Sequence, residues 1–345
     1  MSMIVFIVWL QFIICAACIA VAGFYLSRYG DVIARRTGMS GSWIGLVLVA
    51  TVTSLPELAT GVTSVTIAHA PNLAVGDALG SCVVNLVFLV LIDFVFRQGP
   101  IWRRASQGHV LAAAFGVVLL GYALVSLLMS QITNPAGENL GFKVPRLHFG
   151  LTTPILLMLY LVAMRTVFSY EKAHYVPVVN EEGDILPPLR LAVQRFFFAA
   201  VLVAVAGSWL PFAATNLSEI MGWSRTFVGS LFVAFVTSLP ELVITLSALR
   251  IGAVDMAIGN LLGSNLFNVV IIAIDDLFYQ SGSLLADVSL VHAVTAGSAI
   301  IMTGLAMIGL FFRPDSRVLR AVGWVSIGLA AMYLLNTYIL YIYGE

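Results

Sequence analysis

The chain has 345 residues, of which 60% are hydrophobic and only 10% are charged. Soluble domains carry about 25% charged residues, so this composition excludes an ordinary water-soluble protein. Lys and Arg together number 17, as do Asp and Glu, and the lack of a basic excess argues against nucleic-acid binding. With a mean hydropathy of +1.01, the sequence predicts an all-α polytopic membrane protein.

Ten apolar segments, each about as long as a membrane-crossing helix, follow one another along the chain. Charged residues, Gly or Pro bound each segment. An even number of spans puts both termini on the same side of the membrane. The expected spans are 3–26, 42–68, 73–96, 109–130, 149–169, 192–212, 225–250, 254–279, 285–311 and 319–342.

The basic residues predict the orientation of these spans. Positive charges accumulate in cytoplasmic loops. If the N-terminus faces outward, the only Lys and Arg residues in outside loops are Lys143, Arg146 and Arg225, and the other fourteen lie inside. We therefore expect an integral protein of the cell (inner) membrane with both termini facing away from the cytoplasm.

An internal repeat divides the chain in two. The sequence ATVTSLPELATGVTS at 50–64 returns as AFVTSLPELVITLSA at 234–248, and GDALGSCVVN at 76–85 returns as GNLLGSNLFN at 259–268. Each half holds five spans, so the second copy crosses the membrane in the opposite direction to the first. Inverted repeats of this kind are common in secondary transporters, whose sites lie at the repeat interface.

The repeat predicts the domain organisation. Residues 1–170 form the first five-helix repeat and residues 192–345 the second. Residues 171–191 form a cytoplasmic linker, in which Glu181, Glu182 and Asp184 lack the spacing of an EF-hand calcium loop. We expect this linker to be a solvated hinge.

Two carboxylates stand in the middle of expected spans. Glu57 and Glu241 each follow a proline, which has no N–H and leaves nearby backbone carbonyls available. Thr53 and Ala50 lie on the same helix face as Glu57, and Thr237 and Ala234 repeat this pattern beside Glu241. An ionisable side chain at this depth is costly unless it is paired or coordinated.

The following span of each half carries a second polar stripe. Its residues are Asp77, Ser81 and Asn85 in the first copy and Asn260, Ser264 and Asn268 in the second. Gly76, Gly80, Gly259 and Gly263 are small enough to let neighbouring helices approach closely. Carboxylates, hydroxyls, amides and carbonyls are hard ligands that suit Ca²⁺ or Na⁺ and disfavour soft transition metals.

The two TSLPEL segments, together with GDALGS and GNLLGSN, resemble the alpha repeats of the calcium/cation antiporter superfamily, in its sodium/calcium exchanger branch. The resemblance implies Ca²⁺ ligands at Glu57, Glu241, Thr53 and Thr237. It implies sodium sites that share the glutamates and add Ser81, Ser264 and the carbonyls of Ala50 and Ala234, with Asn85 and Asn268 at the centre. It also implies that the first and sixth spans slide to gate access.

The chain departs from the family pattern at several positions. Many prokaryotic relatives have Asp where Asn268 stands, which leaves two core carboxylates here. The family's usual Gly before Thr-Ser is Val52 in one copy and Val236 in the other. Asp77 replaces the usual Asn, and we expect it at an extracellular entrance. Other acidic residues near span ends, Asp93, Asp275 and Asp276, are expected to be solvated helix caps.

The expected function is antiport of Ca²⁺ against Na⁺, in which both ions compete for the shared glutamates. The near alternatives are proton coupling and transport of another cation. A membrane-embedded enzyme would need an asymmetric site, whereas this chain presents the same ligands twice, and a static channel does not need inverted repeats. We expect no cofactor and no obligate protein partner, only the transported ions and the bilayer.

Overall fold

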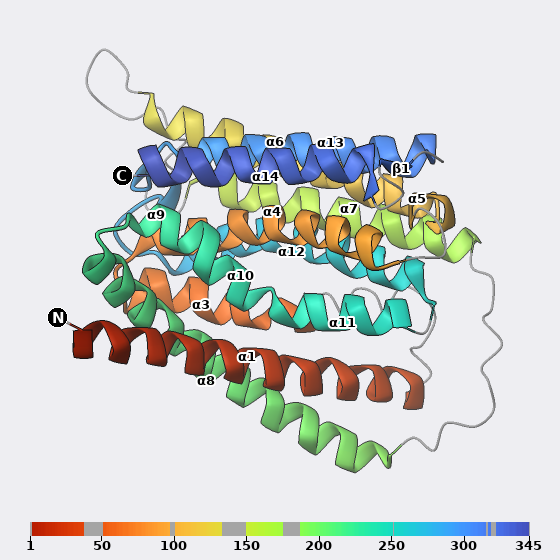
Figure 1. Ribbon diagram of the computed structural model, residues 1–345, viewed down its shortest axis with the longest axis horizontal. Helices are drawn as coiled ribbons and strands as arrows, with labels where there is room; N and C mark the ends of the chain where they lie inside the picture. Colours follow the sequence, from red (N-terminus) through yellow and green to blue (C-terminus); the bar gives the residue numbers. More distant parts are fainter. Residues whose placement is uncertain are drawn as a thin grey trace.

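The computed structural model describes residues 2–37, 51–96, 101–132, 150–174, 187–250, 252–314, 317–318 and 322–344. These residues form a bundle of helices aligned with its longest axis (Figure 1). The first residues of the first helix and the last residues of the last helix lie at the same end of the bundle (Figure 1). This agrees with the expectation that both termini share a side.

The elements follow the order of the expected spans, with short helices between them. In chain order they are α1 (Ser2–Arg36), α3 (Leu55–Thr66), α4 (Pro71–Val95), α5 (Ile101–Arg104), α6 (Gly108–Gln131), α7 (Thr152–His174), α8 (Leu189–Met221), α9 (Arg225–Phe227), the π-helix η1 (Val228–Val233), α10 (Ala234–Thr237), α11 (Leu239–Arg250), α12 (Val254–Phe278), the 3₁₀-helix η2 (Leu284–Ala286), α13 (His292–Phe312) and α14 (Trp324–Tyr343). Two-residue strands, β1 (Arg317–Val318) and β2 (Val322–Gly323), pair antiparallel between α13 and α14.

Eight of the described helices are long and apolar enough to cross a membrane, and the bent pair Arg225–Thr237 and Leu239–Arg250 raises the number to nine. The remaining expected span, 42–68, lies partly outside the described residues, and α3 forms its second half. Three expected boundaries are wrong by more than five residues: the span at 285–311 begins at His292 instead, the span at 3–26 continues to Arg36 and the span at 192–212 continues to Met221. The residues before His292 form η2, which buries Leu284 and Leu285.

The expected linker, 171–191, is helical at both ends. α7 continues to His174 and α8 begins at Leu189, so helix extends into both ends of 171–191. The acidic residues Glu181, Glu182 and Asp184 lie outside the described residues.

α4 and α12 form the centre of the bundle. In their most apolar stretches, 72% of the residues of α4 and 83% of those of α12 are buried, against 22% in α1. These two helices carry the predicted polar stripes, so the polar residues occupy the protein interior while the outer helices contribute the apolar surface. This distribution is the one expected when lipid surrounds the bundle.

The close approach predicted for the small residues of α4 is confirmed at two positions. A Cβ added at Gly80 would lie 2.5 Å from the Ser230 carbonyl oxygen, and one at Gly76 would lie 3.1 Å from the Ser230 nitrogen. Gly229 in turn lies against the Leu73 backbone, with a Cβ position 3.0 Å from its oxygen. Glycines on both helices therefore let the backbone of α4 contact that of η1.

α1 and α8 pack along each other on one flank of the bundle (Figure 1). Gly23 of α1 lies directly against Pro240, with a Cβ position 2.7 Å from the proline Cβ. Gly207 of α8 lies against Pro56, with a Cβ position 3.1 Å from its carbonyl oxygen. The Thr60 hydroxyl donates a hydrogen bond to the Gly207 carbonyl at 3.1 Å. The two glycines are 184 residues apart, and so are the two prolines.

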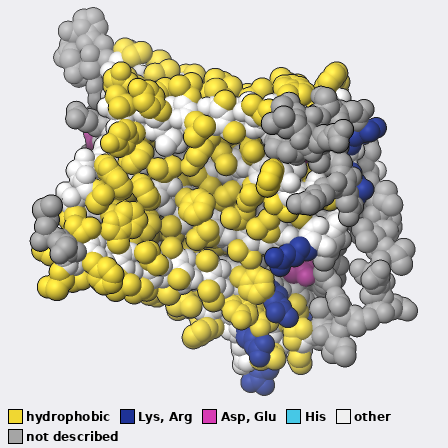
Figure 2. All heavy atoms as spheres, viewed as in Figure 1, with side chains coloured by type: hydrophobic (Ala, Val, Ile, Leu, Met, Phe, Trp, Pro, Cys, Tyr) yellow, Lys and Arg dark blue, Asp and Glu magenta, His cyan; other side chains and the backbone are white. Residues whose placement is uncertain are grey.

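Figure 2 shows a broad hydrophobic surface over the middle of the molecule, with Lys and Arg side chains toward the end where α1 ends and α8 begins. Large exposed hydrophobic side chains of the described residues include Phe197 and Phe198 of α8 and Phe311 and Phe312 of α13. Large apolar patches of this extent mark contact with lipid or protein. The structure therefore has the surface of an integral membrane protein.

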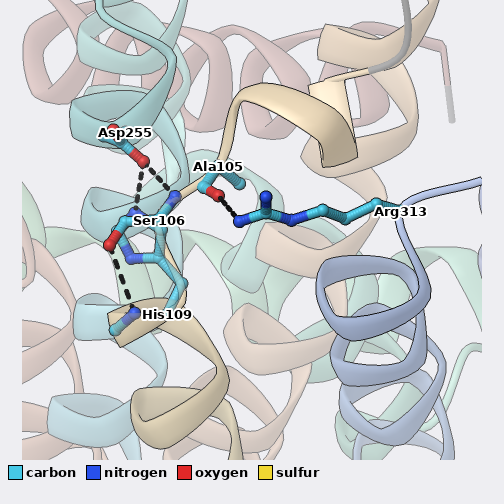
Figure 3. Close-up of polar contacts among 6 residues, drawn as sticks. Ala105, Ser106, His109, Asp255 and Arg313 are labelled. Atoms are coloured by element: carbon cyan, nitrogen blue, oxygen red, sulfur yellow. Dashed lines mark hydrogen bonds and ion pairs between the residues drawn. The ribbon is translucent and has the colours of Figure 1, made fainter.

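The first turn of α12 is fixed to the segment before α6 by a polar cluster (Figure 3). Asp255 Oδ1 accepts a hydrogen bond from the Ser106 backbone N–H at 2.5 Å and lies 3.1 Å from His109 Nε2. Beside it, Arg313 donates to the Ala105 carbonyl at 3.0 Å. These contacts hold together the ends of α6, α12 and α13 at the end of the bundle opposite the termini.

Candidate functional site

The two TSLPE segments interrupt their helices at the same point. Ser54 and Ser238 each form a turn, and new helices begin at Leu55 and Leu239. Pro56 occupies the first turn of α3, where its missing N–H costs little. In the second copy the helices on either side of the break are bent by 43°. The prolines thus end one helix and start the next beside the glutamates.

Glu57 and Glu241 are completely buried and paired with the opposite copy of the repeat. The Ser238 hydroxyl donates to Glu57 Oε1 at 3.2 Å, and the Ser54 hydroxyl donates to Glu241 Oε1 at 3.2 Å. The second carboxylate oxygen of each glutamate has no hydrogen-bond partner among the described residues. Each carboxylate therefore retains one oxygen for a ligand.

Threonine and serine hydroxyls pair across the copies in the same reciprocal way. Thr53 Oγ1 lies 3.3 Å from Ser264 Oγ, and Ser81 Oγ lies 3.4 Å from Thr237 Oγ1. Thr53 and Ser264 also lie within interaction range of the Glu241 carboxyl. The hydroxyls of both halves thus surround the glutamates.

α4 and α12 contact each other through another reciprocal pair. The Cys82 thiol donates a weak hydrogen bond to the Asn265 carbonyl at 3.6 Å, and the Asn265 amide donates to the Cys82 carbonyl at 3.0 Å. The Asn85 amide donates to Asn265 Oδ1 at 3.0 Å. Asn268 is fully buried, and both its amide atoms lack a partner among the described residues. Its amide is therefore available to an ion or a water molecule.

Asp77 lies deeper than the sequence predicted. Its side chain is buried and 1% exposed, where an entrance residue would face solvent. Asp77 Oδ1 accepts hydrogen bonds from Thr237 at 2.8 Å and from Ser81 at 3.5 Å, and Oδ2 has no partner among the described residues. The structure therefore brings Asp77 into contact with the hydroxyls that surround the glutamates.

Asn260 occupies the position equivalent to Asp77 in the second copy. Its amide donates to the Glu241 carbonyl oxygen and to the Thr245 hydroxyl, each at 3.4 Å. It thus contacts the backbone of the helix that carries Glu241, on the other side of the site.

Hydrogen bonds between the two copies link the predicted glutamates, threonines and serines, whereas, among the described residues, the Asn85 side chain bonds only to Asn265, and Asn268 has no hydrogen-bond partner. Ala234 carries a carbonyl that accepts from Ser81 at 3.5 Å and from Thr237 at 3.2 Å. Its counterpart Ala50 lies outside the described residues. The sequence reasoning missed Ser54, Ser238 and Asn265. All three lie inside the repeated motifs. Ser54 and Ser238 could have been found because they occur in both TSLPE copies, and Asn265 because it directly follows Ser264.

The three outer acidic residues are buried rather than solvated. Asp93 Oδ2 accepts from the Gly323 N–H at 2.9 Å and from the Ser326 hydroxyl at 2.7 Å. Asp276 accepts from the Leu284 N–H at 2.6 Å and from the Thr153 hydroxyl. Both carboxylates cap neighbouring backbone from inside the protein. Asp275 has no such bond among the described residues.

The charge and burial of the site residues determine which ligands the site can bind. Glu57 interacts electrostatically with Glu241 and with Asp77, and like charges in an interior of low dielectric constant repel strongly. The described residues contain no group of three or more His, Cys, Asp or Glu side chains that could hold a metal ion. A cation here would be held by carboxylate pairs together with hydroxyl, amide and carbonyl oxygens, which are the ligands of hard cations.

The sequence profile of the sodium/calcium exchanger protein family matches residues 7–170 and 191–342. The chain belongs to this family. The match covers both copies of the repeat and stops on either side of the expected linker. The sequence likeness to the calcium/cation antiporter superfamily is thereby confirmed.

Relatives and solved structures of this exchanger family agree with the fold. The sodium/calcium exchanger MaX1 of Methanosarcina acetivorans is 26% identical over 275 residues, which cover 74% of this chain and 78% of MaX1. The structure of the sodium-calcium exchanger NCX_Mj superposes with a TM-score of 0.62 at 21% identity and covers 99% of this chain and 100% of that one. The H⁺/Ca²⁺ exchanger CAX superposes with a TM-score of 0.70 at 13% identity, over 96% and 81% of the two chains.

These likenesses support a membrane transporter of the exchanger family. The names of the relatives describe exchangers, which favours cation antiport over the membrane-enzyme alternative. The similar solved structures include both a sodium-calcium exchanger and a proton-calcium exchanger. Because their sequence identities to this chain are only 21% and 13%, they establish the fold alone.

Proposed function

We propose that this protein is a secondary antiporter that exchanges Ca²⁺ for Na⁺ by alternating access. The observation that carries the proposal is the reciprocal pairing of Glu57 and Glu241 with serines of the opposite repeat, which leaves one oxygen free on each carboxylate. Uncompensated carboxylates are expensive at membrane depth. A bound cation would supply the missing partners.

The ligand assignment follows the geometry and the family likeness. Ca²⁺ is bound by Glu57 and Glu241 together with the hydroxyls of Thr53 and Thr237. Na⁺ ions use the same glutamates and add Ser81, Ser264 and the backbone carbonyls of Ala234 and Ala50, with the amides of Asn85 and Asn268 between them. The hydroxyl pairs at 3.3 and 3.4 Å support this assignment because they join the two halves beside the carboxylates.

Competition for the two glutamates couples the ions. Ca²⁺ and Na⁺ cannot occupy the same carboxylate oxygens together, so each ion displaces the other. An empty site leaves buried like charges facing each other, which disfavours the change between access states without an ion. Exchange then requires no contact between the two kinds of ion.

We infer that residues 1–170 and 192–345 are inverted repeats of five spans each, joined by 171–191. Reciprocal contacts support this inference: residue i of one copy contacts residue j of the other, and the equivalent of j contacts the equivalent of i. A two-fold axis produces contacts of this kind. The Ser–Glu, Thr–Ser and Cys–Asn pairs all follow this rule.

α1 and α8 are the first and sixth spans, and the proposal assigns gating to them. Gly23 and Gly207 lie against the prolines that precede the glutamates. A sliding movement of either helix would therefore act directly on the broken helices of the site.

The protein is proposed to lie in the cell membrane with both termini facing away from the cytoplasm. The gathering of Lys and Arg side chains at the end of the bundle opposite the termini supports this orientation (Figure 2).

Uptake of ⁴⁵Ca²⁺ into proteoliposomes loaded with Na⁺ tests the proposal, with K⁺-loaded and acid-loaded vesicles from the same preparation as controls. Uptake driven only by internal Na⁺ supports sodium coupling. Uptake driven by acid loading with Na⁺ absent would assign the protein to proton coupling. Absence of uptake under every gradient would refute Ca²⁺ as the substrate.

A further inference from the structure

The last two turns of α12 carry two adjacent buried carboxylates with different surroundings. Asp276 is satisfied by the Leu284 N–H and the Thr153 hydroxyl. Asp275 is 0% exposed, and neither of its carboxylate oxygens has a hydrogen-bond partner among the described residues. A buried carboxylate without partners is strongly destabilising, so Asp275 requires an explanation that Asp276 does not.

The carboxyl group of Asp275 contacts α3 one turn beyond Glu57. A Cβ added at Gly61 would lie 2.7 Å from Asp275 Oδ1 and 2.8 Å from its Cγ. Only a glycine leaves room for the carboxyl group at this point. Ser64, on the same face of α3, is also buried, and its hydroxyl has no partner among the described residues.

Asp77 is the second acidic group of this region. Asp77 and Asp275 are close enough to interact electrostatically. Asp77 keeps Oδ2 without a partner among the described residues, while Oδ1 is bonded to Thr237. Two buried carboxylates therefore combine at least three unpartnered oxygens beside the hydroxyl network of the central site.

The repeat shows that neither carboxylate is required by the fold. Asn260 occupies the position equivalent to Asp77, and Ile92 occupies the position equivalent to Asp275. Asp276, by contrast, is equivalent to Asp93, and both cap backbone N–H groups. The acidic pair is thus confined to one half of the interior, between the glutamates and the end of the bundle where α3 ends and α4 begins.

We propose that Asp77 and Asp275 form a second cation site, for Ca²⁺ or a similar hard divalent cation, about one helical turn from the Glu57–Glu241 site. The second site rests on the proposed function, because the ion that it binds is the transported cation. Two carboxylates match a divalent charge, the Gly61 backbone borders the Asp275 carboxyl, and the unpartnered Ser64 hydroxyl lies about one turn further along α3. The site holds an ion on its way between the central site and this end of the protein.

Equilibrium binding of ⁴⁵Ca²⁺ to the purified full-length protein, in Na⁺-free K⁺ medium, tests the second site. We expect two Ca²⁺ ions per wild-type chain, one per Asp275→Asn chain and one per Glu57→Gln chain. The matched control is Asp287→Asn, which removes an exposed carboxylate just beyond η2 that accepts only from Tyr279 in the described structure. This control should retain two ions.

Unchanged stoichiometry and affinity in Asp275→Asn would overturn the second site, as would a wild-type protein that binds one ion or none. If Asp275→Asn fails to fold, Asp275→Ile provides the same test with the residue that this fold accepts at Ile92. Gly61→Ala should also lose one ion because its methyl group would occupy the place of the Asp275 carboxyl.

Binding and exchange separate the two proposals. Loss of one ion in Asp275→Asn together with no Na⁺-driven uptake by the wild type would retain the second site and refute sodium exchange. Na⁺-driven uptake by the wild type, with binding that Asp275→Asn leaves unchanged, would refute the second site and retain the proposed function. In the expected case, Asp275→Asn raises the external Ca²⁺ concentration for half-maximal uptake about tenfold and leaves the maximal rate within about twofold.

Discussion

Ser54 and Glu241 are 187 residues apart in the chain, yet the serine hydroxyl donates a hydrogen bond to the glutamate carboxylate at 3.2 Å. Ser238 and Glu57 repeat the contact at the same distance. Each carboxylate is thus oriented by a residue that directly precedes the proline-bearing turn of the opposite copy. Because the two contacts are equivalent, removing either one should have a similar effect on ion binding.

Replacing either serine with alanine should weaken ion binding to a similar degree. A hydrogen bond to a charged group contributes about 1.5–3 kcal/mol, so Ser54→Ala and Ser238→Ala should each raise the Ca²⁺ concentration for half-maximal uptake by about tenfold or more. Uptake measured across a range of Ca²⁺ concentrations in proteoliposomes checks this. Ser247→Ala is the control, because this exposed serine bonds only within its own helix at Val243.

A double-mutant cycle tests whether each serine acts through its partner. The effect of Ser238→Ala on the thermal midpoint in detergent should shrink in a Glu57→Gln background, where the acceptor is no longer charged, and persist in a Glu241→Gln background. Equal effects in both backgrounds would contradict the specific pairing.

Neutralising either glutamate should abolish exchange. Glu57→Gln or Glu241→Gln removes one of the two charges that balance a bound Ca²⁺, and leaving a buried charge without its partner typically costs about 3–5 kcal/mol, enough to reduce Ca²⁺ uptake to background. Glutamine keeps the oxygen that accepts from serine, so the variants should still purify as folded protein. Glu219→Gln, an exposed glutamate paired with Arg225, should transport normally. Retained uptake in both core variants would refute the site.

Asn268→Asp should strengthen Ca²⁺ binding. This substitution adds a third carboxylate at a buried position whose amide atoms have no partner among the described residues. The number of charged ligands tunes calcium affinity, and we expect an increase on the order of tenfold in equilibrium ⁴⁵Ca²⁺ binding. A decrease in affinity, with the fold intact by thermal unfolding, would show that the amide at this position does not face the ion.

Adding one methyl group to the glycines that contact the prolines should impair both stability and transport. Gly23→Ala would overlap Pro240, and Gly207→Ala would crowd the Pro56 carbonyl. Overpacking of this kind costs about 1–3 kcal/mol, which should lower the thermal midpoint in detergent. Gly297→Ala is the control, because nothing lies within 4 Å of its added Cβ. A control that loses as much stability as Gly23→Ala would contradict the packing argument.

The repeated motifs allowed much of the site to be predicted from the sequence. Glu57 and Glu241 stood out because buried charge occurs twice at equivalent positions. The spacing by four residues placed Ser81 on one face of its helix with Asp77 and Asn85, and Ser264 on one face of its helix with Asn260 and Asn268. Ser54 and Ser238 did not stand out, because their partners lie in the opposite copy. Only the three-dimensional packing of two distant segments reveals that contact.

The sequence did not predict that the acidic residues near the helix ends are buried. Asp93 and Asp276 lie at positions where a solvated cap is the ordinary outcome, but the N–H of the distant Gly323 bonds to Asp93 and the N–H of Leu284, in the segment after α12, bonds to Asp276. The same segment buries Leu284 and Leu285 and delays the start of α13. Local hydropathy does not encode such tertiary contacts, so both the solvation of these residues and that helix boundary were predicted wrongly.

The unequal pairs Asp77 with Asn260 and Asp275 with Ile92 also bear on the resting state of the protein. Two identical inverted halves would give the inward-facing and outward-facing forms the same free energy, so neither would predominate without ions. Acidic residues in only one half remove that equality, because opening that half to water hydrates its carboxylates while opening the other does not. The ion-free protein should therefore favour the state in which the acidic half is open to water, and it should bind its next cation from that side.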